Sequence, residues 1–202
     1  MNIVLRLLFL SLFPFSVLAM PIQFTHTGVG SGVIGSITFQ DAAFVITGTG
    51  DTDNLQFGGG RWIAHDSASI WIEGVGTANF SSGTRTWVNG DFMGFGRTAT
   101  PGFNAYDLYN WSHYPEFTSW DMLTSFAQIS GTARLFQWSG PGYPDVTTDL
   151  GALVFNFNDA VPATFKAVVG AAPPAGVPEP LTLLMVALGL VGIGIAIRRR
   201  AK

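Results

Sequence analysis

Residues 101–128 carry the side chains best suited to chemistry, because tyrosine and tryptophan alternate there with aspartate and asparagine. A ring of this kind offers an apolar face to the C–H face of a sugar, and nearby amides and carboxylates offer partners to its hydroxyl groups. The alternative is that these rings fill the core, as large aromatic side chains usually do. The candidate sugar contacts are Tyr106, Tyr109, Trp111, Tyr114 and Trp120.

The dipeptide His65–Asp66 is a second pattern with chemical potential, since a histidine beside a carboxylate can bind a metal or act as a base with its orienting group. Consecutive residues of a strand point to opposite faces of a sheet, which weakens both roles. The other histidines, His26 and His113, are too far away in sequence to complete a metal-binding motif. We therefore expect ordinary surface histidines, with no metal and no cofactor.

Residues 51–54, Asp-Thr-Asp-Asn, resemble the opening of a calcium-binding loop. An EF-hand loop continues with Asp or Asn at its fifth position, Gly at its sixth and Glu at its twelfth. This chain has Leu55, Gln56 and Trp62 at those positions, so the EF-hand pattern fails. A polar turn is the plainer interpretation, and a looser extracellular calcium site is the alternative.

Enzyme motifs are missing from the sequence, which has no G-x-S-x-G, no H-E-x-x-H and no phosphate-binding loop. Residues 30–35 match the letters G-x-G-x-x-G, but the chain lacks the βαβ pattern that makes them a dinucleotide-binding fingerprint. It also has no cysteine, so disulfides, thiolate metal sites and a cysteine nucleophile are excluded. A carboxylate pair for glycoside hydrolysis stays open, because the separation of two carboxylates is a tertiary property. We expect a non-catalytic domain. The alternatives are a secreted polysaccharide hydrolase and a calcium-dependent carbohydrate-binding adhesion module.

Charge in the central part of the chain is sparse and negative. Residues 20–170 contain five lysines or arginines and twelve aspartates or glutamates, a formal charge of −7. Nucleic-acid binding requires clustered cations that neutralise phosphates. The sequence therefore argues against a nucleic-acid partner.

The elements that must position these residues are predicted to be β-strands. Short runs of β-branched and aromatic residues are separated by Gly, Asn, Asp and Ser turns, without the βαβ alternation of a parallel sheet. This pattern predicts an all-β fold, a single antiparallel β-sandwich of jelly-roll-like type over residues 20–170. The expected strands are 33–39, 43–49, 69–73, 77–80, 84–89, 132–138, 152–157 and 164–169.

Three finer expectations follow from the same pattern. A turn at residues 40–42 should join the first two strands, and residues 101–128 should form a long loop with one short helix at 119–126. Along the strand at 152–157, Leu153, Phe155 and Phe157 should point inward.

The N-terminus has the features of a secretory signal peptide. Arg6 supplies a positive charge, a short apolar run follows, and Val17 and Ala19 occupy the −3 and −1 positions of a cleavage site. The apolar run is too short to span a bilayer core of roughly 30 Å. We expect cleavage of residues 1–19 after Ala19, and export of the residues that follow.

The C-terminus predicts a membrane anchor. Residues 171–180 form a proline-rich linker, and residues 181–197 contain a single polar residue, Thr182. At 1.5 Å per residue this run makes about 25 Å of helix, enough to cross a thin bilayer. The basic residues 198–202 should stay in the cytoplasm and leave the preceding domain outside. The residues that set this topology are Arg198, Arg199 and Arg200.

This tail resembles a known sorting signal. The sequence Val177-Pro178-Glu179-Pro180, an apolar helix and a terminal arginine cluster, in that order, is similar to the PEP-CTERM signal of Gram-negative exported proteins. The resemblance covers residues 177–202 only. It implies processing by an exosortase, a membrane-embedded transpeptidase-like enzyme, at or near Pro178, Glu179 and Pro180.

Proteins with this signal are commonly tied to exopolysaccharide and biofilm matrix. The resemblance therefore implies an envelope protein that is anchored in the membrane, or released to the cell surface after processing of the tail. Its implied partners are the membrane, the processing enzyme and extracellular polysaccharide, and its implied role is structural or interactive. A plain, permanent tail anchor is the alternative.

Overall fold

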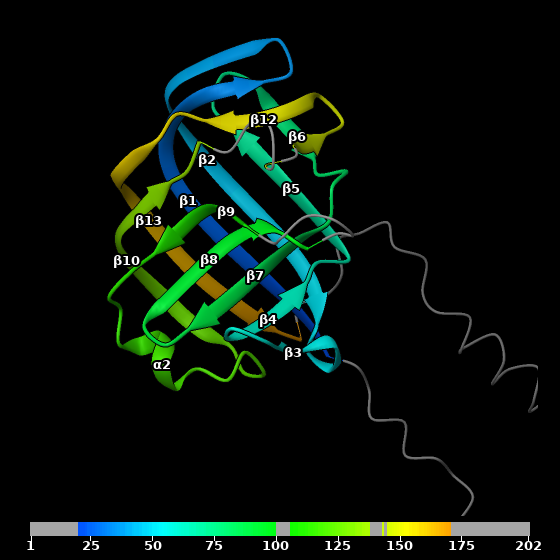
Figure 1. Ribbon diagram of the computed structural model, residues 1–202, viewed down its shortest axis with the longest axis vertical. Helices are drawn as coiled ribbons and strands as arrows, with labels where there is room; N and C mark the ends of the chain where they lie inside the picture. The colour runs from blue at the N-terminus through cyan, green and yellow to red at the C-terminus, as the bar shows by residue number, and fades with distance from the viewer. Residues whose placement is uncertain (1–19, 100–105, 138–142, 144, 171–202) are drawn as a thin grey trace, which may run out of the picture. The chain divides into compact units, whose positions relative to one another are not determined.

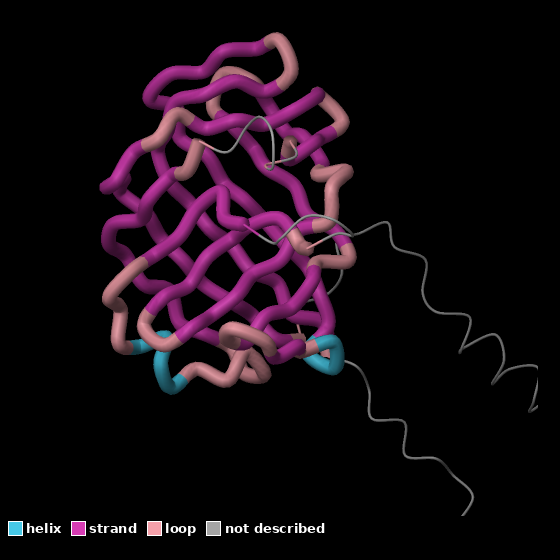
Figure 2. The backbone as a smooth tube through the Cα atoms, viewed as in Figure 1, coloured by secondary structure: helices cyan, strands magenta, loops and turns pink. Residues whose placement is uncertain are grey.

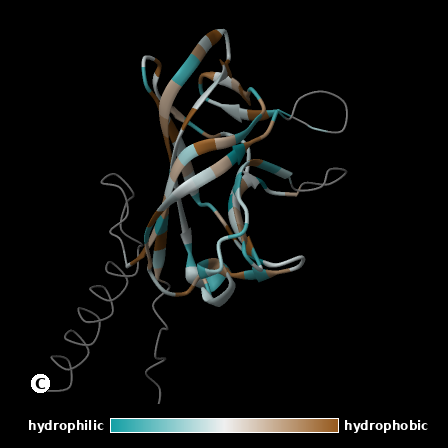
Figure 3. Cartoon of the chain, turned by 90° about the vertical axis from the view of Figure 1, so that its left-hand side faces the viewer, coloured by the Kyte–Doolittle hydropathy of each residue, from teal (hydrophilic) through white to brown (hydrophobic). Residues whose placement is uncertain are grey.

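Alternation of apolar and polar side chains forms β-strands along most of the described chain. The computed structural model describes residues 20–99, 106–137, 143 and 145–170. In β1 (Pro21–Ile34) every second side chain from Ile22 onward is buried, and the same period of two continues through the inner half of β2 (Ile37–Asp51). Figure 3 shows this period as bands of high and low hydropathy along the strands. Each strand therefore presents one face to a core and one face to solvent.

The remaining elements are short, and strands greatly outnumber helices (Figures 1 and 2). The helices are the 3₁₀ turn η1 (Thr52–Asn54) and α2 (Glu116–Ser119). The other strands are β3 (Gln56–Phe57), β4 (Arg61–Ala64), β5 (Ser67–Ile72), β6 (Gly76–Asn79), β7 (Thr84–Asn89), β8 (Phe92–Arg97), β9 (Tyr106–Trp111), β10 (Phe126–Leu135), β11 (Val146–Thr148), β12 (Gly151–Phe155) and β13 (Asn158–Val169).

All strand pairs in the described part of the chain are antiparallel and belong to one sheet, in the order β3-β4-β7-β8-β9-β10-β13-β1-β2-β5-β6. Strand β12 pairs with β1, and β11 pairs with β12. The sheet curls until β7 and β8 lie in front of β1 and β13 (Figure 1). The predicted all-β antiparallel class is confirmed. The strands form one continuous curled sheet, however, and not the two separate sheets of a jelly-roll sandwich, because β9, β10 and β13 connect the halves by hydrogen bonds.

The core fills the inside of this curl. Phe44 of β2 and Tyr109 of β9 are buried, and their ring centroids lie 6.0 Å apart although their strands are not neighbours in the sheet. Burial of such a side chain contributes roughly 1.5–3 kcal/mol each. Packing across the curl therefore holds the two halves of the sheet together without disulfides.

The first hairpin turns earlier than the sequence predicts. The chain turns at Gly35, whereas residues 40–42 belong to β2, so the predicted turn is wrong. Gly35 has a φ of +57°, and a Cβ there would collide with the carbonyl oxygen of Leu150. Glycine alone accepts this backbone conformation at little cost. Asp41, with a φ of +47°, instead sits in a bulge of β2, where residues 40 and 41 oppose the single residue Ser31 of β1.

Residues 101–128 are also more regular than expected where the structure describes them. Strand β9 replaces the first part of the predicted loop, and the helix lies at Glu116–Ser119 instead of residues 119–126. Strand β10 already begins at Phe126. The predicted loop is therefore wrong for these residues, because the aromatic side chains pack as alternate members of strands.

The predicted inward face of β12 is confirmed for Leu153 and Phe155, which are fully buried. It is wrong for Phe157, whose side chain is 55% exposed. The strand ends at Phe155, so the alternation of faces does not continue to residue 157.

No helix in the described part of the chain is long and apolar enough to cross a membrane. The predicted signal peptide at residues 1–19, linker at 171–180, transmembrane helix at 181–197 and basic tail at 198–202 lie outside the described residues.

Candidate functional site

Two glycines leave part of the sheet's outer face bare. Met93 and Phe95 of β8 point into the core and are fully buried, so Gly94 and Gly96 between and after them face outward. Neither glycine has a side chain to project from the sheet. Side chains of the neighbouring strands β7 and β9 can therefore lie flat over β8.

Trp87 of β7 occupies the first bare position. It pairs with Gly94, and a Cβ added at residue 94 would lie 2.6 Å from the indole Nε1 of Trp87. The indole N–H crosses β8 and donates to Oδ1 of Asp107 at 2.7 Å. The second carboxylate oxygen, Oδ2, accepts from Nδ2 of Asn110 at 3.3 Å. The ring and the carboxylate thus fix each other on the outer face.

Arg85 lies beside the second bare position, because it pairs with Gly96, where an added Cβ would meet the backbone of Tyr106 and Asp107. Its guanidinium carbon lies 5.5 Å from the ring centroid of Trp62, a cation–π contact with strand β4. Trp62 in turn pairs with Trp87, so the two indoles are neighbours on the same face. Burial lowers the pKa of Arg85, and the nearby Asp107 carboxylate acts in the opposite direction.

These side chains surround a hollow of about 290 Å³, which we call the outer-face pocket. Its volume is at the small end of the range for ligand-binding pockets. The lining residues are Gly58, Gly59, Gly60, Arg61, Trp62, Arg85, Trp87, Tyr106 and Asp107.

Asp107 is the single carboxylate among the described residues that line the outer-face pocket. Burial raises its pKa, while hydrogen bonds from Asn110 and Trp87 and the charge of Arg85 lower it. Glycoside hydrolysis by the usual routes requires two carboxyl groups across the bond that is cleaved. The described lining of the outer-face pocket supplies one such group, Asp107.

Most of the predicted sugar contacts belong to the core. Tyr109 and Trp111 are fully buried, and Trp120 is 5% exposed. Tyr114 packs against the core, and its hydroxyl accepts a hydrogen bond from the backbone N–H of Thr132 at 2.9 Å. The sugar-contact prediction is wrong for Tyr109, Trp111 and Trp120, because the curled sheet needs large rings to fill its interior. It stays a prediction for Tyr114, which is only partly buried.

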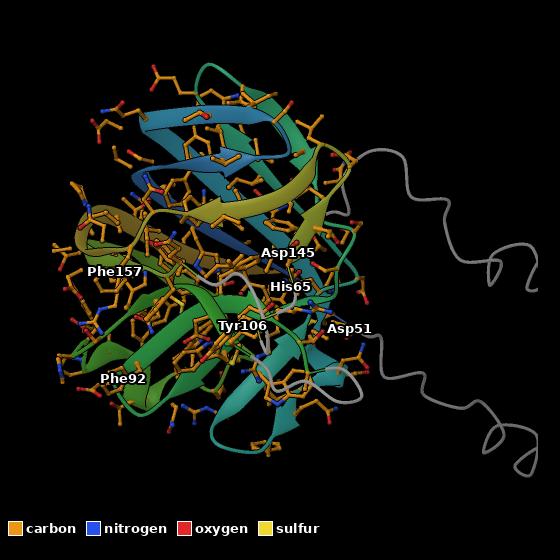
Figure 4. All side chains as sticks on the ribbon, turned by 45° about the horizontal axis from the view of Figure 1, so that its top comes forward. Asp51, His65, Phe92, Tyr106, Asp145 and Phe157 are labelled. Atoms are coloured by element: carbon orange, nitrogen blue, oxygen red, sulfur yellow. The ribbon has the colours of Figure 1, made fainter. Side chains whose placement is uncertain are left out.

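Tyr106, labelled in Figure 4, is the one predicted contact that lines the outer-face pocket. Its ring also packs against that of Tyr143, with the ring centroids 5.9 Å apart. Sequence reasoning missed Trp62, Arg85 and Trp87. The available signal was the alternation in residues 84–88, Thr-Arg-Thr-Trp-Val, which places Arg and Trp together on the face opposite to the buried residues.

A larger hollow of about 390 Å³ lies beside the bulge of β2, and Phe157, which lines it, lies apart from Tyr106 in Figure 4. Its lining includes Asp41, Asn156 and Asn158, and its single aromatic ring belongs to Phe157. No cation lines it among the described residues. It offers one exposed ring where the outer-face pocket offers two indoles and a phenol.

The histidines differ from the expectation of three surface residues. His113 is exposed and lies 3.2 Å from the Asp91 carboxylate, as a surface histidine should. His26 is fully buried, and a single hydroxyl, Oγ1 of Thr86, lies 3.1 Å from both His26 Nε2 and His65 Nε2. The surface prediction is therefore wrong for His26 and His65, which the curl of the sheet brings together inside.

One proton arrangement satisfies this cluster best. His26 Nε2–H donates to Thr86, the Thr86 hydroxyl donates to His65 Nε2, and His65 Nδ1–H donates to Thr84 Oγ1 at 2.9 Å. The reverse direction would leave a buried N–H of His26 without an acceptor, since His26 Nδ1 has no partner among the described residues. An unpaired lone pair costs less than an unpaired N–H, so we assign the first arrangement, in which both imidazoles are neutral.

The remaining metal-site candidates give no cluster. Asp66 is exposed and makes no hydrogen bond with the ring of His65 in the described structure. The carboxylate of Asp51 accepts the N–H of Asp53 at 2.8 Å and caps the turn η1. No group of three or more potential ligands occurs among residues 20–99, 106–137, 143 and 145–170.

The sorting residues Pro178, Glu179 and Pro180 and the arginines at 198–200 lie outside the described residues. In comparisons with known proteins, the chain matches no family model, and no curated protein and no solved structure is significantly similar to it.

Proposed function

We propose that this chain is an exported envelope protein whose β domain binds extracellular polysaccharide through the outer-face pocket. In this proposal the domain is non-catalytic and has a structural or interaction role in the polysaccharide matrix. The predicted signal peptide directs export, and the predicted helix at residues 181–197 holds the protein in the membrane until an exosortase-type enzyme processes the tail.

The observation that carries the proposal is the pairing of Trp62 and Trp87 on the outer face with Arg85 and Asp107 beside them. Indole rings stack on the C–H faces of pyranose rings, while the guanidinium donates to sugar oxygens and the carboxylate accepts from sugar hydroxyls. The indole of Trp87 is already held by Asp107, so little side-chain freedom would be lost on binding.

The acidic character of the domain is consistent with this role. Its charge of −7 argues against nucleic acid, which leaves polymers that carry hydroxyl groups as the plainer partners for a partly buried aromatic face. The sequence resemblance of the tail points to the same matrix independently of the pocket.

Substitution of Trp87 and Trp62 by alanine tests the proposal. Binding of the purified full-length protein to a panel of soluble polysaccharides is measured by affinity electrophoresis and calorimetry. Each variant should bind at least about tenfold more weakly, because loss of one stacking ring removes on the order of 1.4 kcal/mol.

Trp71→Ala is the matched control, because Trp71 of β5 is 43% exposed and does not line the outer-face pocket. Its binding should equal that of the unmodified protein. Equal affinity of all four proteins for every glycan, or binding by none of them, would rule out the pocket as a polysaccharide site.

A further inference from the structure

We infer that the outer-face pocket selects a uronic acid residue, with Arg85 as the ligand of its carboxylate. This inference rests on the proposed function and adds the class of sugar. It starts from the guanidinium of Arg85, whose Nε atom is buried and has no hydrogen-bond partner among the described residues. The same group makes no ion pair with a carboxylate in the described part of the chain.

A partly buried guanidinium without an anion is unusual, because removal of its charge from water must be offset by hydrogen bonds or by an opposite charge. The face of Trp62 offsets part of this cost. The Nη atoms of Arg85 are free for a ligand, and a planar guanidinium matches a carboxylate through two parallel hydrogen bonds.

Asp107 does not take the place of that anion. Its two oxygens accept hydrogen bonds from Trp87 and Asn110, and no oxygen of Asp107 lies within the 4.0 Å limit of an ion pair with Arg85. Asp107 would also repel a second carboxylate placed next to it. The ligand must therefore present a carboxylate to Arg85 and hydroxyl groups to Asp107, and a uronate ring carries both.

The other arginine of the pocket is already engaged. Nη2 of Arg61 donates to the carbonyl oxygens of Phe117 and Thr118 in α2, at 3.4 Å each. The Nε atom of Arg61 is buried without a partner, like that of Arg85, so the difference between them lies in the Nη atoms. Arg85 is the pocket arginine whose Nη atoms make no hydrogen bond among the described residues, and these stay available for a ligand. Because the domain as a whole is negative, a short oligosaccharide reports on this contact better than a long polyanion, which the rest of the surface would repel.

The test compares trimers of galacturonate, glucuronate and mannuronate with their methyl esters, which keep the ring and lose the charge. Binding to the full-length protein in mild detergent is measured by calorimetry. The unmodified protein should bind at least one acid trimer tenfold or more tightly than its ester. Arg85→Gln should abolish this preference, because it should weaken binding of the acid at least tenfold more than binding of the ester. Arg85→Lys should restore only part of the preference, because an ammonium lacks the planar fork.

Thermal unfolding of each variant should show that the domain remains folded. Esters that bind as tightly as the acids, with Arg85→Gln unchanged and Trp87→Ala abolishing both, would overturn the uronate inference and leave the proposed polysaccharide function standing. Absence of binding to any glycan, charged or neutral, would overturn both.

Discussion

Acidification from pH 7.5 to 4.5 should destabilise the β domain through the histidine pair inside the curl. Burial lowers the pKa of His65 from 6.5 to about 3, and it lowers the pKa of His26 well below 6.5, with the charge of His65 adding to the effect. Both imidazoles are neutral in the folded state, where Thr86 has one proton to share between them. The unfolded chain takes up protons near pH 6.5, whereas the folded chain resists protonation until much lower pH.

The sign and size follow from linkage. A folded-state pKa below the unfolded value means that full stability is present above pH 6.5 and is lost as the pH falls from 6.5 towards 3. Over the interval from 7.5 to 4.5, His65 alone should cost about 2.7 kcal/mol of unfolding free energy. This loss of unfolding free energy is an upper bound, because part of the His65 residue is exposed to solvent. His26 acts in the same direction.

Denaturant unfolding at the two pH values measures the effect for the unmodified protein, for His65→Gln and for the exposed control His113→Gln. The difference between the two pH values should shrink by about 2–3 kcal/mol in His65→Gln, since glutamine does not titrate. It should stay unchanged in His113→Gln. Asp107, whose pKa is raised by burial, acts in the opposite direction in all three proteins and therefore cancels from the comparison.

An equal loss of stability in His65→Gln and in the unmodified protein would refute the reasoning. It would mean that other groups cause the acid sensitivity, or that water reaches the two rings in the folded state.

Two other predictions concern the outward-facing glycine of β8, Gly94, and the C-terminal tail. Gly94→Ala should displace the indole of Trp87, because the new Cβ would lie 2.6 Å from its Nε1, and glycan affinity measured by calorimetry should fall at least about fivefold. Gly90→Ala is the control: its φ of +60° strains the new Cβ, but no atom lies within 4 Å of it, so stability should fall while affinity stays unchanged. If instead Gly94→Ala binds normally, the flat packing of Trp87 is not required. Glu179→Ala should block processing of the tail without preventing membrane insertion, and alanine at residues 198–200 should reduce processing. Both effects are measured as the intact mass of the protein from cells with and without the processing enzyme. A mature protein that always retains residues 181–202 would contradict the sorting hypothesis.

The sequence by itself determined the strands whose faces alternate cleanly. The strands predicted at residues 69–73 and 84–89 correspond to β5 and β7, because a period of two is a local property that each strand carries in its own side chains. The same local logic failed at the first hairpin. Residues 40–42 look like a turn by composition, but the chain turns where Gly35 meets the backbone of a distant strand.

Only the tertiary structure decided which rings face the core and which face solvent. Tyr109 and Trp120 look like ligand contacts in the sequence, yet the curl of the sheet buries them. Trp62 and Trp87 instead line the outer-face pocket and are only partly buried. The partners of the candidate site come from β4, β7 and β9, and they meet because β8 carries glycine on its outer face. Strand order and register are non-local, since they depend on how all strands share one interior. A single sequence therefore specifies each strand's two faces but does not reveal which faces will meet.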